Sequence, residues 1–390
     1  MNIFVAQSGG PTSVINSTLY GVVAQAEEVD GVKNVYASTN GLEGLLKNNI
    51  IHLNGKVDLL KKAKDQPGAI LGGSRFELTD VDFEKIVDKL LELSINVFCY
   101  IGGNGSSRTI NKVHEICISR NLEIKCIFIP KTVDNDVCGT DHTPGYLSAA
   151  KFLIQSLNHI EADIRSNNFP PQIEIMEVMG GNAGWLIGAS AIRKKQKNDF
   201  PQIVYLPEDE KTIDEILSDI QSALIESTNI LLMVPDHMKL TSVASEINQN
   251  NPRHKYNGGV SYRLAQEIQK NLKIKTTITI PNKLYRSSMN LVSHQDLHEA
   301  EIIGREAISA ALSGESGKLI GIERTSADPY EYKLIRVDLS EISGKERVLP
   351  SDYWDSNNFM PTEKFRNYLL PLLEKEIDME SKYLTTEYLF

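Results

Sequence analysis

Short apolar runs that alternate with amphipathic stretches fill most of the chain, and this pattern predicts an α/β fold. The runs from Ile3 to Ala6 and from Asn96 to Ile101 are almost wholly apolar, which is typical of strands buried on both faces of a sheet. Each leads through a glycine-bearing loop into a stretch with helical character, and another apolar run at 124–129 follows the second helix. Strand, tight loop and helix in this order indicate βαβ units and a parallel sheet.

The alternation resumes in the second half of the chain. Further strands are predicted at 173–178, 203–206, 229–234 and 272–280, and a further helix is predicted at 296–312. Capping boxes mark two more helix starts, at Thr79 and at Thr212. We therefore predict two doubly wound α/β domains with mainly parallel sheets, at 1–150 and 151–390. The second domain carries a C-terminal extension, and the chain is expected to cross back to the first domain around 275–310.

The composition narrows the classes of function. Of 390 residues, 41% are hydrophobic and 24% are charged, as in ordinary globular domains. The 41 Lys and Arg against 51 Asp and Glu give a net charge of −10, so we expect no general binding to nucleic acid or to an anionic membrane. An anionic ligand must therefore be held by a local pocket. The sequence has no basic, signal-type opening and no apolar run near the roughly 18 residues of a membrane span. Its cysteines do not have the spacing of a metal finger. We therefore predict a cytoplasmic protein.

Three loops directly follow predicted strands and open toward helices. The carboxyl ends of parallel strands meet at one edge of a sheet, so these loops are expected to share one cleft. Gly9-Gly10 and the segment Gly102–Ser106 can each present bare backbone amides to an anion. Neither matches the P-loop or the dinucleotide fingerprint, and a tight turn between strand and helix is the simpler explanation of either loop taken alone.

The third loop, Pro130–Asp136, carries more chemistry. Lys131, Asp134 and Asp136 offer a cation for a phosphate, a general base and a magnesium ligand within a few residues. Phosphoryl transfer needs little else, because its catalysis consists of orienting a hydroxyl, accepting its proton and neutralising the charge of the transferred group. The alternative is an Asx-rich turn with a solvated charge cluster.

Taken together, these segments resemble the phosphofructokinase family over almost the full length, and most of all its bacterial pyrophosphate-dependent branch. The motifs that carry the resemblance, in chain order, are Gly9-Gly10 with Asn16, Gly73-Ser74-Arg75, Gly102–Ser106, Lys131–Asp136, Thr140–Gly145, Glu177–Gly180, Asn182–Leu186, Tyr285-Arg286-Ser287 and Tyr368–Leu372. The resemblance implies Mg²⁺-dependent phosphorylation of fructose 6-phosphate or a related sugar phosphate by a homodimer or homotetramer.

The resemblance also implies roles for single residues. Asp134 would be the base toward the acceptor hydroxyl, with Lys131, Thr132 and Asp136 as its catalytic neighbours. The residues that would hold the donor phosphates are Gly10, Arg75, Gly103, Asn104, Gly105 and Ser106, with Asn104 also a ligand of Mg²⁺. The residues that would bind the acceptor are Met179, Gly180, Asp236 and Arg286.

Departures from the family pattern leave the donor open between ATP and pyrophosphate. Pyrophosphate-using relatives have an aspartate at the position of Gly105, in the space that the α-phosphate of ATP needs, so the glycine marginally favours ATP. Lys131 is the residue that pyrophosphate users carry, although some ATP users have it as well. Asn104 stands where many ATP users have a magnesium-binding aspartate, and its amide oxygen can still ligate Mg²⁺.

The acceptor site departs further. Gly181 and Gln172 stand where relatives have arginines, and the segment 275–278 lacks an arginine that relatives place against the sugar phosphate. Each missing guanidinium removes a phosphate contact of about 1.5–3 kcal/mol. Asp236 replaces the glutamate usual in the family. The acceptor therefore stays open between fructose 6-phosphate and a related compound.

Two other classes of function fit parts of the sequence. The missing arginines and Asn104 would also suit a paralogue that binds a sugar phosphate or nucleotide without catalysis, but the intact Lys131–Asp136 loop argues against it. A dinucleotide-binding oxidoreductase fits the α/β alternation but lacks the required glycine fingerprint. His142 is interpreted as a turn or packing histidine, and His294 with His298 as a solvated pair that lacks a third metal ligand.

Overall fold

The computed structural model describes residues 1–74, 76–166, 171–241, 259–373 and 375–377. The chain divides into two compact units, and each of them is discontinuous in sequence. The first unit consists of Met1–Ala149 and Arg286–Arg347, and the second consists of Ala150–Tyr285 and Val348–Phe390. The chain thus leaves the first unit near residue 150 and returns to it at Arg286. None of the described helices is long and apolar enough to cross a membrane.

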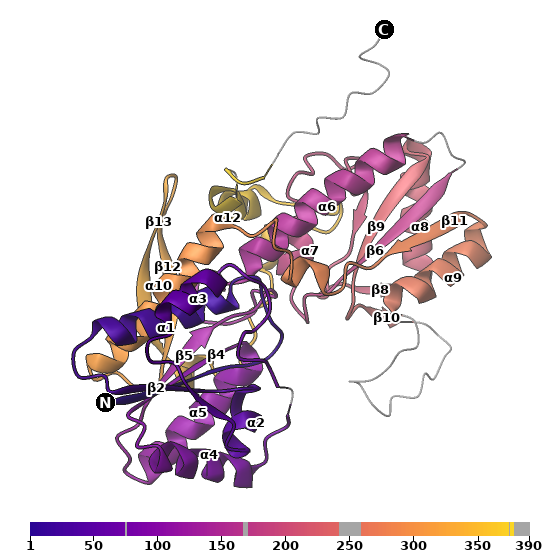
Figure 1. Ribbon diagram of the computed structural model, residues 1–390. Helices are drawn as coiled ribbons and strands as arrows, with labels where there is room; N and C mark the ends of the chain where they lie inside the picture. Colours follow the sequence, from indigo (N-terminus) through magenta and orange to yellow (C-terminus); the bar gives the residue numbers. More distant parts are fainter. Residues whose placement is uncertain (75, 167–170, 242–258, 374, 378–390) are drawn as a thin grey trace. The chain divides into compact units, whose positions relative to one another are not determined.

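The first unit is built on a seven-stranded sheet with the strand order β13-β12-β5-β4-β1-β2-β3 (Figure 1). Its strands are β1 (Asn2–Gln7), β2 (Asn34–Ser38), β3 (Ile50–His52), β4 (Val97–Gly102), β5 (Lys125–Pro130), β12 (Lys318–Ala327) and β13 (Tyr330–Asp338). Every pairing from β12 to β2 is parallel, whereas β3 and β13 join the two edges antiparallel. The mainly parallel α/β fold expected from the apolar runs is confirmed.

Successive residues of the central strands face opposite sides of this sheet, and helices cover both sides. Ile3 and Cys99 belong to one apolar cluster, and their neighbours Phe4 and Phe98 belong to another. The first cluster is covered by α1 (Ile15–Glu28), α3 (Val57–Ala63) and α10 (His294–Leu312). The second cluster is covered by α2 (Gly41–Leu46), α4 (Asp80–Glu92), α5 (Asn104–Ser119) and α11 (Leu339–Ile342). Burial on both faces explains why these strands are apolar along their length.

Helices α1 and α10 lie side by side although they come from opposite ends of the chain (Figure 1). Two glycines permit their close approach. A Cβ added to Gly21 would lie 2.0 Å from the carbonyl oxygen of Glu301, and one added to Gly304 would lie 2.3 Å from that of Thr18. The Ser17 hydroxyl also donates to the carbonyl of Leu297 at 2.9 Å. This crossing fixes the returning segment to the N-terminal part of the first unit.

The second unit contains a four-stranded parallel sheet with the order β11-β6-β9-β7. Its strands are β6 (Gln172–Val178), β7 (Ile203–Val204), β9 (Asn229–Pro235) and β11 (Lys275–Thr279). Two separate two-stranded sheets complete the unit. One pairs β8 (Glu210–Thr212) with β10 (Lys239–Thr241), and the other pairs β14 (Trp354–Asp355) with β15 (Met360–Pro361). Its helices are α6 (Tyr146–Ser166), which starts in the first unit, α7 (Trp185–Ser190), α8 (Ile213–Glu226), α9 (Val260–Leu272) and α12 (Glu363–Leu373). Rings of Tyr353, Phe365 and Tyr368 pack around Trp185 and hold the C-terminal segment in this unit.

The structure differs from the sequence prediction at several elements. The strand predicted at 272–280 starts only at Lys275, because Leu272 still belongs to α9 and Lys273 ends that helix in a left-handed conformation with φ of 56°. The hairpin formed by β12 and β13 was not predicted. Both capping boxes are confirmed, at the starts of α4 and α8.

Candidate active site

The loop after β1 carries the first pair of glycines and is bound by a buried lysine. Gly9 has a φ of +71°, a left-handed conformation that favours glycine. The ammonium of Lys131 donates to the carbonyl oxygens of Ser8 at 2.8 Å and of Gly10 at 2.6 Å. Lys131 itself is only 2% exposed. The loop Pro130–Asp136 after β5 is thereby tied directly to the glycine loop after β1, and both strands pair with β4 at the same edge of the sheet.

A second cation lies over the same glycines. A Cβ on Gly10 would lie 2.7 Å from Nη1 of Arg286, so the guanidinium covers this glycine closely. The Nε of Arg286 is buried and has no hydrogen-bond partner within the described part of the chain. Burial lowers the pKa of Lys131 to about 8, Asp134 and Asp136 raise it, and the nearby charge of Arg286 lowers it further. Two crowded cations beside bare glycine amides form a site that suits a phosphate anion.

The loop Pro130–Asp136 is itself fixed by several hydrogen bonds. The backbone N–H of Asp134 donates to Oγ1 of Thr132 at 3.1 Å. Asn135 turns the chain between the two aspartates with a φ of 56°, and its buried side-chain oxygen accepts the N–H of Thr143 at 3.0 Å. The hydroxyl of Thr143 donates to the carbonyl oxygen of Thr132 at 3.0 Å. The backbone on both sides of Asp134 is therefore held by the segment 143–145, and Gly145 forms an isolated parallel bridge with Thr132.

Asp136 is joined to the loop after β4. The side-chain amide of Asn104 donates to the carboxylate of Asp136 at 2.7 Å and to its carbonyl oxygen at 3.0 Å. Burial raises the pKa of Asp136 to about 7, and the negative charge of Asp134 raises it as well. The two carboxylates are close enough to repel each other, and a cation or a proton between them would relieve that repulsion.

The loop Gly102–Ser106 leads from β4 into α5, with Gly103 in extended conformation at the helix start. Gly102 has no room for a side chain, because a Cβ there would lie 2.0 Å from Oγ of Ser106. Gly105 differs, since it is exposed and no heavy atom lies within 4 Å of the position of its Cβ. Ser106 is buried, and its N–H donates to the carbonyl of Gly103 at 2.9 Å. The space beside Gly105 is therefore open, as the steric argument for ATP requires.

A buried pair of amide side chains supports the loop that precedes Ser74. The side-chain amide of Asn16 donates to the carbonyl oxygens of Gln66 at 3.0 Å and Gly68 at 2.7 Å, and its oxygen accepts the N–H of Ile70. Gln7 donates to Asn16 at 3.2 Å. This positioning role was not predicted, although Asn16 belongs to the motif that begins at Gly9. The predicted donor-site residue Arg75 lies outside the described residues.

Two of the predicted acceptor residues line one cavity of about 100 Å³ in the second unit. The residues that line it are Glu177, Met179, Asp236, Ile280, Asn282 and Tyr285. Oδ1 of Asp236 is buried and has no hydrogen-bond partner within the described residues. Burial raises the pKa of Asp236 to about 6, while His237 lowers it and Glu177 raises it. An unsatisfied carboxylate oxygen in a cavity is suited to accept a hydrogen bond from a ligand hydroxyl.

Neighbouring groups shape the same cavity. The N–H of Met179 donates to the hydroxyl oxygen of Tyr285 at 2.9 Å, and Glu177 accepts the N–H and the hydroxyl of Ser261 at 3.0 and 2.6 Å. Gly180 is buried next to Met179. Sequence reasoning assigned no role to Glu177 or Tyr285, although both stand inside the motifs it used.

The structure thus groups the predicted residues in two sets. The contacts above join one set in the first unit, which consists of Lys131, Thr132, Asp134, Asp136, Asn104 and Gly10. Arg286 belongs to the same set, because it lies over Gly10. Met179 and Asp236 share the cavity of the second unit. The acceptor-binding role of Arg286 stays a prediction. No group of three or more His, Cys, Asp or Glu side chains able to hold a metal occurs among the described residues, so His294 and His298 gain no third ligand there.

Comparison with known proteins gives concordant results. The family model described as phosphofructokinase matches residues 2–311. A pyrophosphate–fructose 6-phosphate 1-phosphotransferase from Halomonas elongata is 30% identical over 386 residues, 96% of this chain and 92% of the relative. A sulfofructose kinase from Alkalicoccus urumqiensis is 32% identical over 355 residues, 90% of this chain and 92% of the relative.

A solved structure matches the fold as well. The pyrophosphate-dependent phosphofructokinase from Marinobacter aquaeolei aligns with a TM-score of 0.85 at 28% identity, covering 95% of this chain and 91% of that chain. The resemblance inferred from the spaced motifs is confirmed, and so is the fold it implies. The chain is a phosphotransferase that belongs to the phosphofructokinase family.

Proposed function

We propose that this protein transfers a phosphoryl group to a hydroxyl of fructose 6-phosphate, with Asp134 as the base that accepts the hydroxyl proton. The observation that carries the proposal is the tie between Lys131 and the Gly9-Gly10 loop, three residues before Asp134. It puts a buried cation, bare amides and a carboxylate at one edge of the sheet. Phosphoryl transfer needs such an arrangement, in which charge is stabilised and the nucleophile is oriented.

Lys131 and Arg286 would neutralise the negative charge of the transferred group. Two of the three ammonium hydrogens of Lys131 are directed at the carbonyls of Ser8 and Gly10, which leaves the third for a donor oxygen. The unpartnered Nε of Arg286 offers one more donor. A dianionic phosphate between these groups would raise the pKa of Lys131 and keep it charged.

The residues fit Mg²⁺, the cofactor that the family resemblance implies. The ion prefers oxygen ligands and usually binds one or two carboxylates together with phosphate oxygens of the substrate. Asp136 and the amide oxygen of Asn104 would hold it, and the mutual repulsion of Asp134 and Asp136 favours a cation there. When bound, Mg²⁺ would supply charge stabilisation to the donor phosphates. Removal of Mg²⁺ by a chelator is expected to abolish turnover, and excess Mg²⁺ is expected to restore it.

ATP is the slightly favoured donor, because the space beside Gly105 is open. The variant Gly105→Asp is expected to depress ATP-dependent turnover and to spare or raise turnover with pyrophosphate. Steady-state kinetics with both donors measure the effect. Equal loss with both donors would contradict the steric explanation, since it would show that the aspartate damages the loop rather than excluding the α-phosphate.

Sulfofructose is a second candidate acceptor. The sulfofructose kinase of Alkalicoccus urumqiensis is 32% identical to this chain, and the sequence lacks the arginines that phosphofructokinases use at Gly181 and at 275–278. A sulfonate carries one negative charge where a phosphate monoester carries nearly two, so it would need fewer guanidinium contacts. Initial rates with fructose 6-phosphate and sulfofructose, each with ATP and with pyrophosphate, distinguish the two acceptors by kcat/KM.

Replacement of the proposed base tests the function as a whole. Asp134→Asn keeps the size of the side chain and removes its basicity, so kcat is expected to fall by roughly 10²–10⁴-fold. Asp30→Asn, at an exposed position of the same unit, is the matched control and should retain wild-type kcat. If the wild-type protein binds these ligands but turns over no pair of donor and acceptor, a non-catalytic paralogue would be supported instead. Dimeric or tetrameric assembly stays a prediction that light scattering can test.

A further inference from the structure

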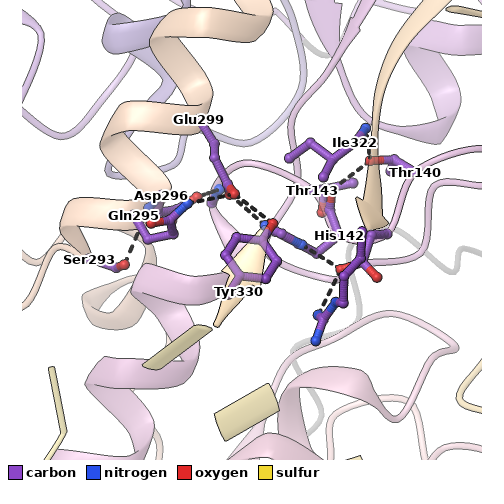
Figure 2. Close-up of polar contacts among 12 residues, drawn as sticks. Thr140, His142, Thr143, Ser293, Gln295, Asp296, Glu299, Ile322 and Tyr330 are labelled. Atoms are coloured by element: carbon purple, nitrogen blue, oxygen red, sulfur yellow. Dashed lines mark hydrogen bonds and ion pairs between the residues drawn. The ribbon is translucent and has the colours of Figure 1, made fainter. Parts of the chain in front are cut away.

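A histidine without any access to solvent lies between two carboxylates behind the catalytic loop. His142 is 0% exposed, and Figure 2 shows its ring beside Glu299 on α10. The other side of the ring faces Asp141, its neighbour in sequence. Its Nδ1 is 2.9 Å from Oδ2 of Asp141, and its Nε2 is 2.5 Å from Oε2 of Glu299. Each ring nitrogen of this buried histidine therefore faces a carboxylate oxygen within hydrogen-bond distance, which plain packing does not require.

The surroundings of the two carboxylates favour the protonated form of the ring. Glu299 accepts hydrogen bonds from the Tyr330 hydroxyl and the Gln295 amide, both at 2.8 Å. Asp141 accepts a hydrogen bond from Arg324 at 2.9 Å. With a carboxylate oxygen facing each ring nitrogen, both nitrogens can donate, and the two negative charges stabilise the imidazolium form of the ring. Burial alone lowers the pKa of His142, but the charge of Glu299 and the hydrogen bond to Asp141 raise it to about 9.

The segment around His142 is fastened to β12 as well as to α10. The Thr140 hydroxyl donates to the carbonyl of His142 at 2.8 Å and accepts the N–H of Ile322 at 3.0 Å (Figure 2). The N–H of Asp141 donates to the carbonyl of Ile322 at 2.8 Å, and Arg347 donates to the carbonyl oxygens of Thr140 and Asp141. The imidazolium thus connects a segment anchored on the sheet to a helix that packs on the sheet.

The anchored segment continues directly into the contacts that shape the catalytic loop. Thr143 follows His142, and its N–H and hydroxyl bind Asn135 and Thr132. Asn135 separates Asp134 from Asp136, and Thr132 binds the N–H of Asp134. A shift of Thr143 would therefore move the backbone on both sides of the proposed base.

We propose that His142 is a positioning residue, a charged link between Asp141 and Glu299 that holds Thr143 in place and so sets the position of Asp134. The effect on turnover rests on the proposed function, whereas the charged link and its effect on the loop do not. Two readouts independent of activity therefore accompany the kinetic one.

The first readout is the protonation state of the ring. In the ¹⁵N NMR spectrum of the full-length protein at pH 7.5, both ring nitrogens of His142 are expected to appear protonated, with slowly exchanging hydrogens. A neutral tautomer, with one nitrogen unprotonated at this pH, would overturn the proposal.

The second readout is the order of the loop. His142→Gln is expected to accelerate amide hydrogen exchange at 132–136 at least tenfold, because the segment that holds Thr143 loses its link to α10. His142→Gln leaves the buried carboxylate of Glu299 without its charged partner, and the single variant can fail to fold for that reason. The double variant His142→Gln with Glu299→Gln removes this carboxylate, so hydrogen exchange can then be measured on the double variant. Unchanged exchange at 132–136 in a folded variant would overturn the proposal.

The third readout is kinetic. His142→Gln is expected to lower kcat at least tenfold, with KM for donor and acceptor within about threefold of wild type, because Asp134 acts on the chemical step. His114→Gln is the matched control, since this half-buried histidine of the same unit binds the hydroxyl of Ser316 rather than carboxylates. Wild-type kcat in a folded His142→Gln variant would overturn the positioning role. Complete inactivity of the wild-type protein would instead refute the proposed function, and the first two readouts would still test the link.

Discussion

The side-chain amide of Asn104 donates to both the carboxylate and the carbonyl oxygen of Asp136, at 2.7 and 3.0 Å. This pair of bonds joins the start of α5 to the catalytic loop after β5. An aspartate at position 104 would add a third negative charge beside Asp134 and Asp136, whereas the amide adds none and stabilises the ionised form of Asp136. Asn104 therefore supports the loop through its amide N–H without adding negative charge beside the two aspartates.

The variant Asn104→Ala removes this support. We expect kcat/KM to fall about 10- to 100-fold, since hydrogen bonds to charged groups contribute about 1.5–3 kcal/mol. Asn111→Ala is the control, because Asn111 lies on the same helix and its amide binds the exposed Glu115. Steady-state kinetics and thermal melting of both variants measure the effect. If Asn104→Ala and Asn111→Ala have equal kcat/KM, the hydrogen bonds from Asn104 to Asp136 do not contribute to catalysis.

The two glycine loops should respond differently to one added methyl group. In Gly10→Ala the new Cβ would lie 2.7 Å from the Arg286 guanidinium, the far end of a flexible side chain, so the guanidinium should move while the fold persists. We expect a loss of at least tenfold in kcat/KM with little change in melting temperature. Gly105→Ala is the steric control for stability, because its Cβ enters open space. A large drop in melting temperature of Gly10→Ala alone would show that backbone strain, not displacement of Arg286, causes the loss.

The cavity in the second unit should determine acceptor affinity. Asp236→Ala removes the unpartnered carboxylate oxygen, and we expect KM for the acceptor to rise about tenfold or more while KM for the donor stays within about twofold. The exposed Asp214→Asn variant serves as control. Equal increases in both KM values would argue against acceptor binding in this cavity. Asp236→Glu restores the residue usual in the family and is expected to retain more affinity for fructose 6-phosphate than Asp236→Ala.

Stability should depend on pH through His142. Its folded pKa of about 9 lies above the ordinary value of 6.5, so its contribution to the free energy of unfolding is complete below pH 6.5 and is lost as pH rises through 9. The difference between wild type and His142→Gln, on the order of 3 kcal/mol at low pH, is therefore expected to shrink between pH 6.5 and 9. Urea unfolding at several pH values measures it. The difference between wild type and His114→Gln should not shrink in this way, because the pKa of His114 is lowered.

Much of the fold was predictable because its strands are buried on both faces. The apolar runs at β1, β4 and β5 and the capping boxes at Thr79 and Thr212 are local signals, and the structure confirms them. The hairpin of β12 and β13 was missed although Tyr330–Asp338 alternates polar and apolar residues. An edge hairpin is half exposed, so it lacks the continuous apolar run that identified the central strands.

The candidate site was predictable only where its chemistry is contained in one short segment. Lys131, Asp134 and Asp136 stand together in sequence, so their contact needed no knowledge of the fold. The contact of Glu299 with His142 could not be predicted, because Glu299 lies 157 residues after His142 and resembles any polar residue of a helix. The contact of Arg286 with Gly10 was missed for the same reason, since it depends on where the chain re-enters the first unit.

The return of the chain to the first unit has a consequence for how the protein is made. When the ribosome has synthesised residue 150, every member of the catalytic loop has been added, but α10, β12 and Glu299 do not yet exist. The glycine-mediated contact between α1 and α10 and the carboxylate opposite His142 form only after the whole second sheet has been translated. We therefore expect a nascent chain released at residue 150 to lack an ordered active-site loop, so that the enzyme acquires its catalytic geometry only late in its biosynthesis.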